Sequence, residues 1–396
     1  MTTQPRPNHV VDPLSPFVEG YLQTLAARGY AERTLGTHKS LIVDASRWLG
    51  ERGLDARDLT PEVVEAYVQK RRASGCWINV SRRGMQPLLA YLESLGVLEL
   101  PTPETDALLA HYRRYLVSER GLMSSTIRTY VATAAAFLAW RQARAAQPIE
   151  SLTAQDLIDY LVGEARRRKG SARSVVAPLR SYLRFLFIDG VTPIALAGAV
   201  PRVANWRLAG LPKGISPGEV ERLLSSCDRS RPSGLRDFAI LKVFTRLGLR
   251  AGEVARLELG DLDWRAGELV VRGKGNRIDK MPLPSDVGMA IADWLASERP
   301  SNSSRTVFTL CQAPYGPMER RTLASVVAGT CRRAGVRVVG PQQLRHTAAI
   351  NMLGAGAGLV EIGQVLRHQR ALTTAIYAKA DLRSLATIAQ PWPGVA

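Results

Sequence analysis

Along the first half of the chain, apolar residues recur every three or four positions, which is the spacing of one face of an α-helix. The clearest run lies in residues 125–140, where the apolar side chains of that face are Ile127, Tyr130, Val131, Ala134 and Leu138. Further helices are predicted after Thr60 and Thr153, because a Thr hydroxyl can cap the amino terminus of a helix. The pattern therefore predicts helical bundles in this half of the chain.

The helical pattern occurs twice. Three blocks match in the same order: residues 28–49 with 120–140, residues 59–68 with 152–161, and residues 88–97 with 182–191. Trp48 and Trp140 take equivalent positions in the two copies, as do Tyr67 and Tyr160. Matches in a fixed order predict a duplicated helical module of about 85 to 90 residues.

From Ser216 the pattern changes. "SPGEVERLL" predicts a helix that Ser216 caps, and "RDFAILKVFTRLG" predicts an amphipathic helix that ends at Gly248. "GELVVRGKGNRIDKMPLP" predicts a β-hairpin with strands 268–272 and 277–283 around a glycine-containing turn. The fold class is therefore mainly α, with two tandem helical-bundle modules followed by a mixed α/β domain, mostly α with a small antiparallel sheet.

Segments that contain Pro or Gly mark the expected joints between these parts, as in the Pro-containing "LPTPET" at 100–105. The expected order is a flexible tail (1–14), a first helical module (15–99), a second helical module (105–195), a linker (196–215) and a C-terminal domain (216–396). The linker carries Arg202 and Arg207, and an extended basic segment of this kind suits a path along DNA.

The charge of the chain points to a polyanionic partner. Lys and Arg number 53 against 35 Asp and Glu, which gives a net charge of +18 over 396 residues. An excess of this size is the electrostatic signature of a nucleic-acid-binding protein. A GC-rich genome would also enrich arginine, so the composition alone leaves both explanations open.

Other compositional features exclude several classes of protein. No apolar run approaches the roughly 20 residues that span a bilayer, and the first residues lack the apolar stretch of a secretory signal. We therefore expect a cytoplasmic protein with no membrane partner. The four cysteines are far apart and the histidines and acidic residues form no ligand motif, so we expect no disulfide framework, no metal site and no cofactor.

A series of residues whose side chains could take part in catalysis runs through the C-terminal half. Their order is Arg250, Glu253, Lys274 in the hairpin turn, Arg345, His368, and Tyr377 nine residues after His368. Taken singly, each has an ordinary explanation as a solvated arginine, a turn lysine, a structural histidine or a core aromatic. The order and spacing of the whole series carry the information.

This series resembles the active site of the tyrosine recombinases, the phage integrase family. The matching strings are "GLRAGEVARLELGDLDW", "GKGNR" and "LRHTAAINMLGAGAGLVEIGQVLRHQRALTTAIYAK". The resemblance covers the whole C-terminal half, and five of six active-site positions match. The N-terminal modules resemble the SAM-like core-binding domain of the family, which occurs here twice.

The resemblance implies a role for each residue. Tyr377 would be the nucleophile that forms a 3′-phosphotyrosyl bond, and Arg250 and Arg345 would hold the non-bridging phosphate oxygens. Lys274 would protonate the leaving 5′ oxygen, and His368 would hydrogen-bond the phosphate. Glu253 would orient the neighbouring cationic side chains.

Two positions depart from the family pattern. Gln342 stands where the family usually has a histidine, three residues before Arg345. A glutamine can donate a neutral hydrogen bond but cannot shuttle a proton, so a slower, working site is expected. Arg367 stands where the family generally has glycine, and the sequence gives no account of its effect.

The resemblance implies a site-specific DNA recombinase, an integrase or transposase of a mobile element, that uses neither metal nor ATP. Its partner would be double-stranded DNA, bound by four protomers on paired sites, with a monomer or dimer in the absence of DNA. Such a protein would work in the cytoplasm and join the nucleoid when bound to DNA. The candidate DNA contacts are Arg33, Arg128, Arg202, Arg207 and Arg277.

Three other functions fit parts of the sequence. A DNA-binding accessory protein without catalysis would retain the fold, and a type IB topoisomerase-like enzyme would use the same chemistry to relax DNA. An RNA-binding helical repeat fits less well, because two copies fall short of the three that a solenoid needs.

Overall fold

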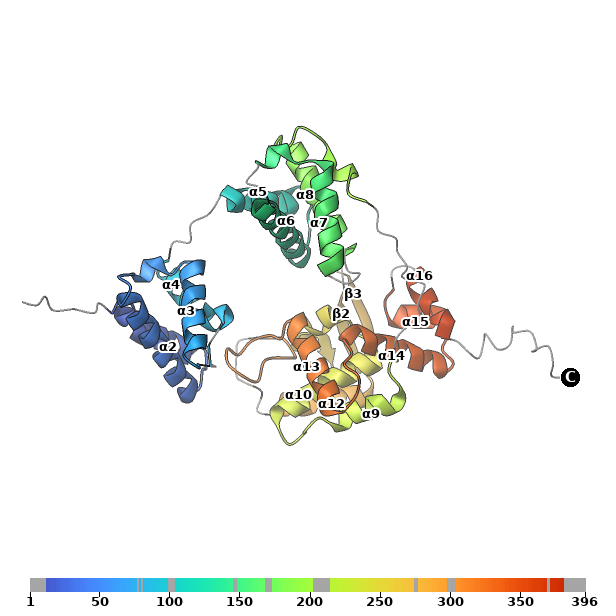
Figure 1. Ribbon diagram of the computed structural model, residues 1–396. Helices are drawn as coiled ribbons and strands as arrows, with labels where there is room; N and C mark the ends of the chain where they lie inside the picture. The colour runs from blue at the N-terminus through green and yellow to red at the C-terminus, as the bar shows by residue number, and fades with distance from the viewer. Residues whose placement is uncertain are drawn as a thin grey trace, which may run out of the picture. The chain divides into compact units, whose positions relative to one another are not determined.

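The computed structural model describes residues 12–76, 78–79, 81–98, 104–144, 148–167, 173–201, 214–273, 277–297, 299, 304–368 and 371–380. Lys274, Arg202 and Arg207 lie outside these residues. The described part is mainly helical and contains one three-stranded antiparallel sheet (Figure 1). This confirms the predicted fold class. The chain forms two compact units, one from residues up to 98 and from 208 onward, the other from 99–207.

The first helical module buries its own hydrophobic core. Its described α-helices are α1 (Val18–Ala27), α2 (Glu32–Gly50), α3 (Pro61–Ala73) and α4 (Arg82–Ser94). Thr60 caps α3, because its hydroxyl accepts a hydrogen bond from the backbone N–H of Val63. Side chains from all four helices meet in this core, among them Tyr21, Leu41, Tyr67 and Leu88.

The second helical module has the same number of described α-helices. They are α5 (Glu104–Ser118), α6 (Ser124–Arg144), α7 (Ala154–Arg167) and α8 (Arg173–Ile188). Leu196 and Val200 are buried in the same core, although the sequence analysis placed both in the linker. The ordered packing of this module thus extends beyond residue 195.

An aromatic pair repeats in the two modules. The rings of Trp48 on α2 and Tyr67 on α3 have centroids 5.4 Å apart and planes inclined at 56°. Trp140 on α6 and Tyr160 on α7 show the same 5.4 Å separation and an angle of 59°. Each Trp also has an arginine one helical turn later lying over its ring, Arg52 in the first module and Arg144 in the second. The repeat seen in the sequence therefore corresponds to a repeated packing arrangement.

The C-terminal part combines helices with the sheet. Its described α-helices are α9 (Pro217–Ser225), α10 (Pro232–Lys242), α11 (Ala251–Val254), α12 (Ser285–Ala296), α13 (Arg320–Arg333), α14 (Pro341–Gly354), α15 (Leu359–Val365) and α16 (Ala371–Thr374). Strand β2 (Glu268–Arg272) pairs with β3 (Ile278–Pro282) as the predicted hairpin, with Val270 opposite Lys280. A short strand β1 (Leu262–Asp263), which the sequence analysis missed, pairs with β2 on the other side. As predicted, Ser216 caps α9.

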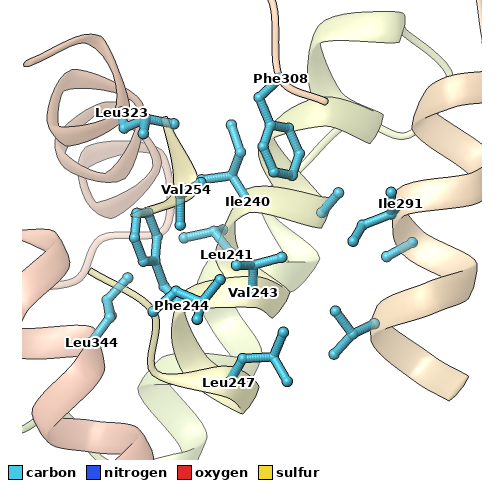
Figure 2. Packing of buried hydrophobic residues seen from close by; sticks show 14 of the residues in the cluster. Ile240, Leu241, Val243, Phe244, Leu247, Val254, Ile291, Phe308, Leu323 and Leu344 are labelled. Carbon is cyan, nitrogen blue, oxygen red and sulfur yellow. The ribbon is translucent and has the colours of Figure 1, made fainter. Parts of the chain in front are cut away.

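The core of the C-terminal part lies around α10. Figure 2 shows Ile240, Leu241 and Phe244 packed between side chains of other helices, among them Ile291 and Leu323. After Lys242 the helix widens into a π-helical turn, η5 (Val243–Leu247), and it ends at Gly248 as predicted. Gly248 has a φ of 58°, and a Cβ there would lie 2.6 Å from Leu366. Glycine is therefore needed where this turn approaches the segment after α15.

A smaller apolar cluster joins α14, α15 and a final 3-10 helix, η7 (Ala375–Ala380). Its buried members are Ala349, Ile362, Leu366 and Tyr377. This cluster fixes the position of Tyr377 within the C-terminal part. In the part of the chain that the structure describes, no helix is both long and apolar enough to cross a membrane.

Candidate active site

Arg250 and Glu253 form a short, rigid unit at the start of α11. Arg250 precedes the helix, and its backbone N–H donates to Glu253 Oε2 at 2.8 Å. Its guanidinium donates to Glu253 Oε1 at 2.7 Å. Glu253 is buried, which raises the pKa of its carboxyl, but the charge of Arg367 and the bonds from Arg250 lower that pKa further than burial raises it. The carboxylate is thus charged and fixes the direction of the Arg250 side chain.

Arg345 lies on α14 and is almost completely buried, with 1% of its surface exposed. Its guanidinium donates hydrogen bonds to the backbone oxygens of Gly248 and Leu366. Burial and the nearby charge of Arg250 lower the pKa of Arg345 to about 9. The group is still a cation at neutral pH, and a bound anion would relieve the repulsion between the two arginines.

Tyr377 is buried between these cations and two histidines. Its hydroxyl lies 2.8 Å from Nδ1 of His346, and its ring stacks on that of His368 with centroids 6.4 Å apart. Burial raises the pKa of the phenol, while the charges of Arg345 and Arg250 act in the opposite direction. The phenol is therefore protonated in the free protein, and it lies within the electrostatic field of both arginines.

His368 lies shortly after the end of α15 at Val365, and a polar contact holds its side chain. Its Nδ1 lies 2.7 Å from the hydroxyl oxygen of Thr374 on α16. Burial, followed by the charges of Arg345 and Arg250, lowers the pKa of His368 to about 4. The imidazole is therefore neutral at physiological pH and can act as a hydrogen-bond donor without carrying charge.

A cavity of about 360 Å³ opens beside Arg250. Gln342, which is exposed near the start of α14, lines it together with Arg250, and so do Arg256 and Arg320. The cavity is large enough for a phosphate group and carries several cationic side chains. Gln342 thus occupies a position from which its amide can reach an anion bound next to Arg250.

Arg367 takes a backbone conformation that favours glycine, with a φ of 54°. Its guanidinium donates to Glu253 Oε2 at 2.8 Å, and the side chain is 9% exposed. The buried carboxylate is thus held from two sides, by Arg250 and by Arg367. The ion pair with Glu253 gives the Arg367 side chain a structural role that the sequence alone did not reveal.

Arg367→Ala should destabilise the protein more than Arg367→Gly. Both variants lose the ion pair with Glu253, but alanine keeps the left-handed strain, which costs roughly 1 kcal/mol relative to glycine. The measurement is thermal unfolding of the two variants side by side. Equal unfolding temperatures would mean that the backbone at 367 relaxes and that the strain has no energetic weight.

The structure brings together most of the predicted site residues. Arg250, Glu253, Arg345, His368 and Tyr377 converge through the contacts above, Gln342 lines the adjoining cavity, and Lys274 lies outside the described residues. The contacts of His346, Arg367 and Thr374 were not predicted from the sequence. Of the candidate DNA contacts, Arg33 on α2, Arg128 on α6 and Arg277 just before β3 are exposed. Among the described residues, no group of three or more His, Cys, Asp or Glu side chains could hold a metal ion.

Comparisons with known proteins agree with this arrangement. Residues 213–383 match the model of the phage integrase family, and residues 18–95 and 109–189 each match the phage integrase N-terminal SAM-like domain. The chain belongs to the phage integrase family, the tyrosine recombinases.

Among its relatives is the protein y4rA of Sinorhizobium fredii, which carries an integrase/recombinase name. The two chains are 37% identical over 97% of this chain and 96% of y4rA. Tyrosine recombinase XerD of Listeria monocytogenes is 30% identical over 68% of this chain and 93% of its own length. The XerD match thus leaves about a third of this chain without a counterpart, whereas the y4rA match spans nearly all of it.

Solved structures share the fold at low sequence identity. The XerH site-specific recombinase, in a post-cleavage complex with a palindromic difH substrate, aligns with a TM-score of 0.55 and 17% identity over 82% of this chain and 94% of XerH. A lambda integrase tetramer bound to a Holliday junction aligns with a TM-score of 0.52 and 16% identity over 74% of this chain and 87% of that chain. At these identities the likeness concerns the fold alone.

Proposed function

We propose that this tyrosine recombinase is the integrase or transposase of a mobile element, cutting and rejoining double-stranded DNA at specific sites through a 3′-phosphotyrosyl intermediate. One observation carries the proposal: the buried hydroxyl of Tyr377 lies in the field of Arg345 and Arg250, and Arg250 also lines a cavity of about 360 Å³ that can hold a phosphate group. A phenol in such a place is suited to attack phosphorus, because the cations favour both the phenolate and the charged transition state.

The two arginines would stabilise the pentavalent phosphorus centre. A phosphodiester carries one negative charge and gains another on attack, so fixed cationic donors are worth more in the transition state than in the ground state. Each preorganised donor of this kind contributes on the order of 10² to 10³ in rate. Glu253 keeps the Arg250 fork in place, and the two backbone carbonyls do the same for Arg345.

The exchange of bonds is balanced. The Tyr377 oxygen forms a bond to phosphorus as the bond from phosphorus to the 5′ oxygen breaks, and Lys274 would supply the proton that the leaving oxygen takes up. Because one phosphoester replaces another, rejoining needs no ATP. The neutral His368 donates a hydrogen bond to a phosphate oxygen, and Gln342 donates a weaker one than a charged histidine would.

The partners follow from the same proposal. Four protomers would hold two DNA duplexes, as in the lambda integrase tetramer on a Holliday junction, and a monomer or dimer would exist without DNA. Exposed Arg33, Arg128 and Arg277, together with Arg202 and Arg207, would contact the DNA backbone. The protein would work in the cytoplasm and join the nucleoid through its DNA.

Covalent trapping tests the proposal. The full chain is incubated with nicked duplexes made from the DNA that flanks its gene, and adducts that survive denaturation are counted with and without EDTA. We expect the same adduct yield in both, because the cations of the site are side chains. Loss of the adduct in EDTA would overturn the metal-free chemistry, and tight binding with no adduct on any duplex would favour an accessory DNA-binding protein.

Two further assays, one with a second labelled duplex and one with a supercoiled plasmid, distinguish recombination from relaxation. An enzyme that exchanges partners joins the cleaved strand to a second, differently labelled duplex that carries the same site. A type IB topoisomerase-like enzyme would relax a supercoiled plasmid as a monomer and form no such joint product. We expect the joint product.

A further inference from the structure

His346 touches the atom that would react. It lies on α14 next to Arg345, and its Nδ1 is 2.8 Å from the hydroxyl oxygen of Tyr377 on η7. The two rings are inclined at 61° with centroids 5.6 Å apart. The 2.8 Å between Nδ1 and the phenol oxygen is a hydrogen-bond distance.

The surroundings decide which atom holds the proton. His346 faces Arg345 on its own helix, Tyr377 on η7 and His368 after α15. Burial and the charge of Arg345 lower the pKa of His346, so its imidazole is neutral at pH 7. Burial raises the pKa of Tyr377, so the phenol keeps its proton. The hydroxyl therefore donates to Nδ1, and the other ring nitrogen of His346 carries the imidazole proton.

The other polar groups of the site are less suited to accept this proton. His368 has a pKa of about 4, and its Nδ1 is already engaged by the Thr374 hydroxyl. Gln342 has an amide, which is not a base at any physiological pH. Arg250 and Arg345 are cations and can only donate. His346 has a basic lone pair on Nδ1, and this lone pair is the one that contacts the phenol.

We propose that His346 is the general base that takes the Tyr377 proton during strand cleavage and returns it during rejoining. As the Tyr377 oxygen bonds to phosphorus, its proton moves to Nδ1 and the imidazole becomes a cation. In the reverse step the 5′ hydroxyl attacks phosphorus and gives its proton back to Lys274, the bond from Tyr377 to phosphorus breaks, and the imidazolium reprotonates the phenolate. The inference rests on the proposed role of Tyr377 as nucleophile.

Two substitutions at this position separate proton transfer from positioning. His346→Asn keeps a hydrogen-bond acceptor close to the place of Nδ1 but removes the basic nitrogen, and His346→Ala removes both. General-base catalysis contributes typically 10² to 10⁴ in rate, so both variants should form the adduct about that much more slowly in single-turnover assays. His111→Ala, at a half-exposed histidine on α5, is the matched control and should cleave at the rate of the unsubstituted chain.

A modified substrate and the pH profile add readouts that a structural role would not move. A nicked duplex with sulfur in place of the bridging 5′ oxygen has a leaving group that needs no proton, so it should restore Lys274→Ala but leave His346→Asn slow. The cleavage rate of the unsubstituted chain should level off above the pKa of His346. The rate of His346→Asn should keep rising into alkaline solution, because only solvent then removes the phenol proton.

The possible outcomes distinguish the general-base role of His346 from the proposed recombinase function on which it rests. If His346→Asn cleaves within about threefold of the unsubstituted chain, or if the sulfur-containing substrate restores it, the imidazole is not the base. Faster cleavage in either variant would mean that the contact restrains Tyr377, which also overturns the inference. If the unsubstituted chain forms no adduct at Tyr377, the proposed function fails, whatever the His346 variants do.

Discussion

Tyr377→Phe is expected to abolish covalent attachment to DNA while leaving DNA affinity unchanged. The substitution removes one oxygen from a ring that is otherwise packed against Ile362 and Leu366, so the site keeps its shape. Loss of an enzyme's nucleophile typically costs at least about 10⁴ in rate. The adduct is measured on a denaturing gel and the affinity by mobility shift, both with the same nicked duplex.

Tyr182→Phe is the matched control for this experiment. Tyr182 is fully buried in the core of the second module, and its hydroxyl has no hydrogen-bond partner among the described residues. Removal of that hydroxyl should leave stability equal or slightly higher, because an unsatisfied polar group disappears. Adduct formation should be unchanged. An adduct in Tyr377→Phe at the rate of Tyr182→Phe would identify another nucleophile and overturn the proposed chemistry.

Arg345→Ala is expected to lose both catalysis and stability. Without the guanidinium, one of the two proposed cationic contacts to the phosphate is gone, and we expect the cleavage rate to fall by on the order of 10² to 10³. The carbonyls of Gly248 and Leu366 also lose their donor, at roughly 1 to 3 kcal/mol for each buried group left unsatisfied. Relief of the repulsion from Arg250 offsets part of that cost. Single-turnover cleavage and thermal unfolding measure the two effects.

Arg345→Lys separates the two effects. A lysine keeps the positive charge but is a compact group that cannot span both carbonyls and a phosphate with a rigid fork. We therefore expect a rate between those of Arg345→Ala and the unsubstituted chain, with an intact circular dichroism spectrum. Cleavage by Arg345→Ala at the unsubstituted rate would remove this residue from the chemistry.

The sequence predicts the fold well where the signal is local or repeated. Helical spacing, the Ser216 cap and the Gly248 terminus all depend on neighbouring residues, and the hairpin depends on alternation around a glycine-containing turn. The π-helical turn at Val243–Leu247 was not predicted, because its apolar residues fit an ordinary helix equally well. Strand β1 was missed because two residues carry no periodicity.

In the active site, too, the residues were predictable from the sequence whereas their tertiary contacts were not. The order and spacing of Arg250, Arg345, His368 and Tyr377 made a family resemblance visible, but not their contacts. His346 adjoins Arg345, and adjacent residues on a helix point in directions about 100° apart, so no pattern predicts that His346 contacts the phenol while the charge of Arg345 acts on it. The ion pair of Arg367 with Glu253 joins residues 114 positions apart, and only tertiary structure can bring it about.

The shared Trp–Tyr packing of the two helical modules has a consequence for how they attract DNA. Both copies keep this aromatic pair, but their net charges differ. Residues 15–99 contain eleven Lys and Arg against ten Asp and Glu, whereas residues 105–195 contain thirteen against seven. Of the two modules, the second is therefore expected to supply most of the long-range attraction to phosphates. The nearly neutral first module would then contact DNA mainly through shape and short-range contacts.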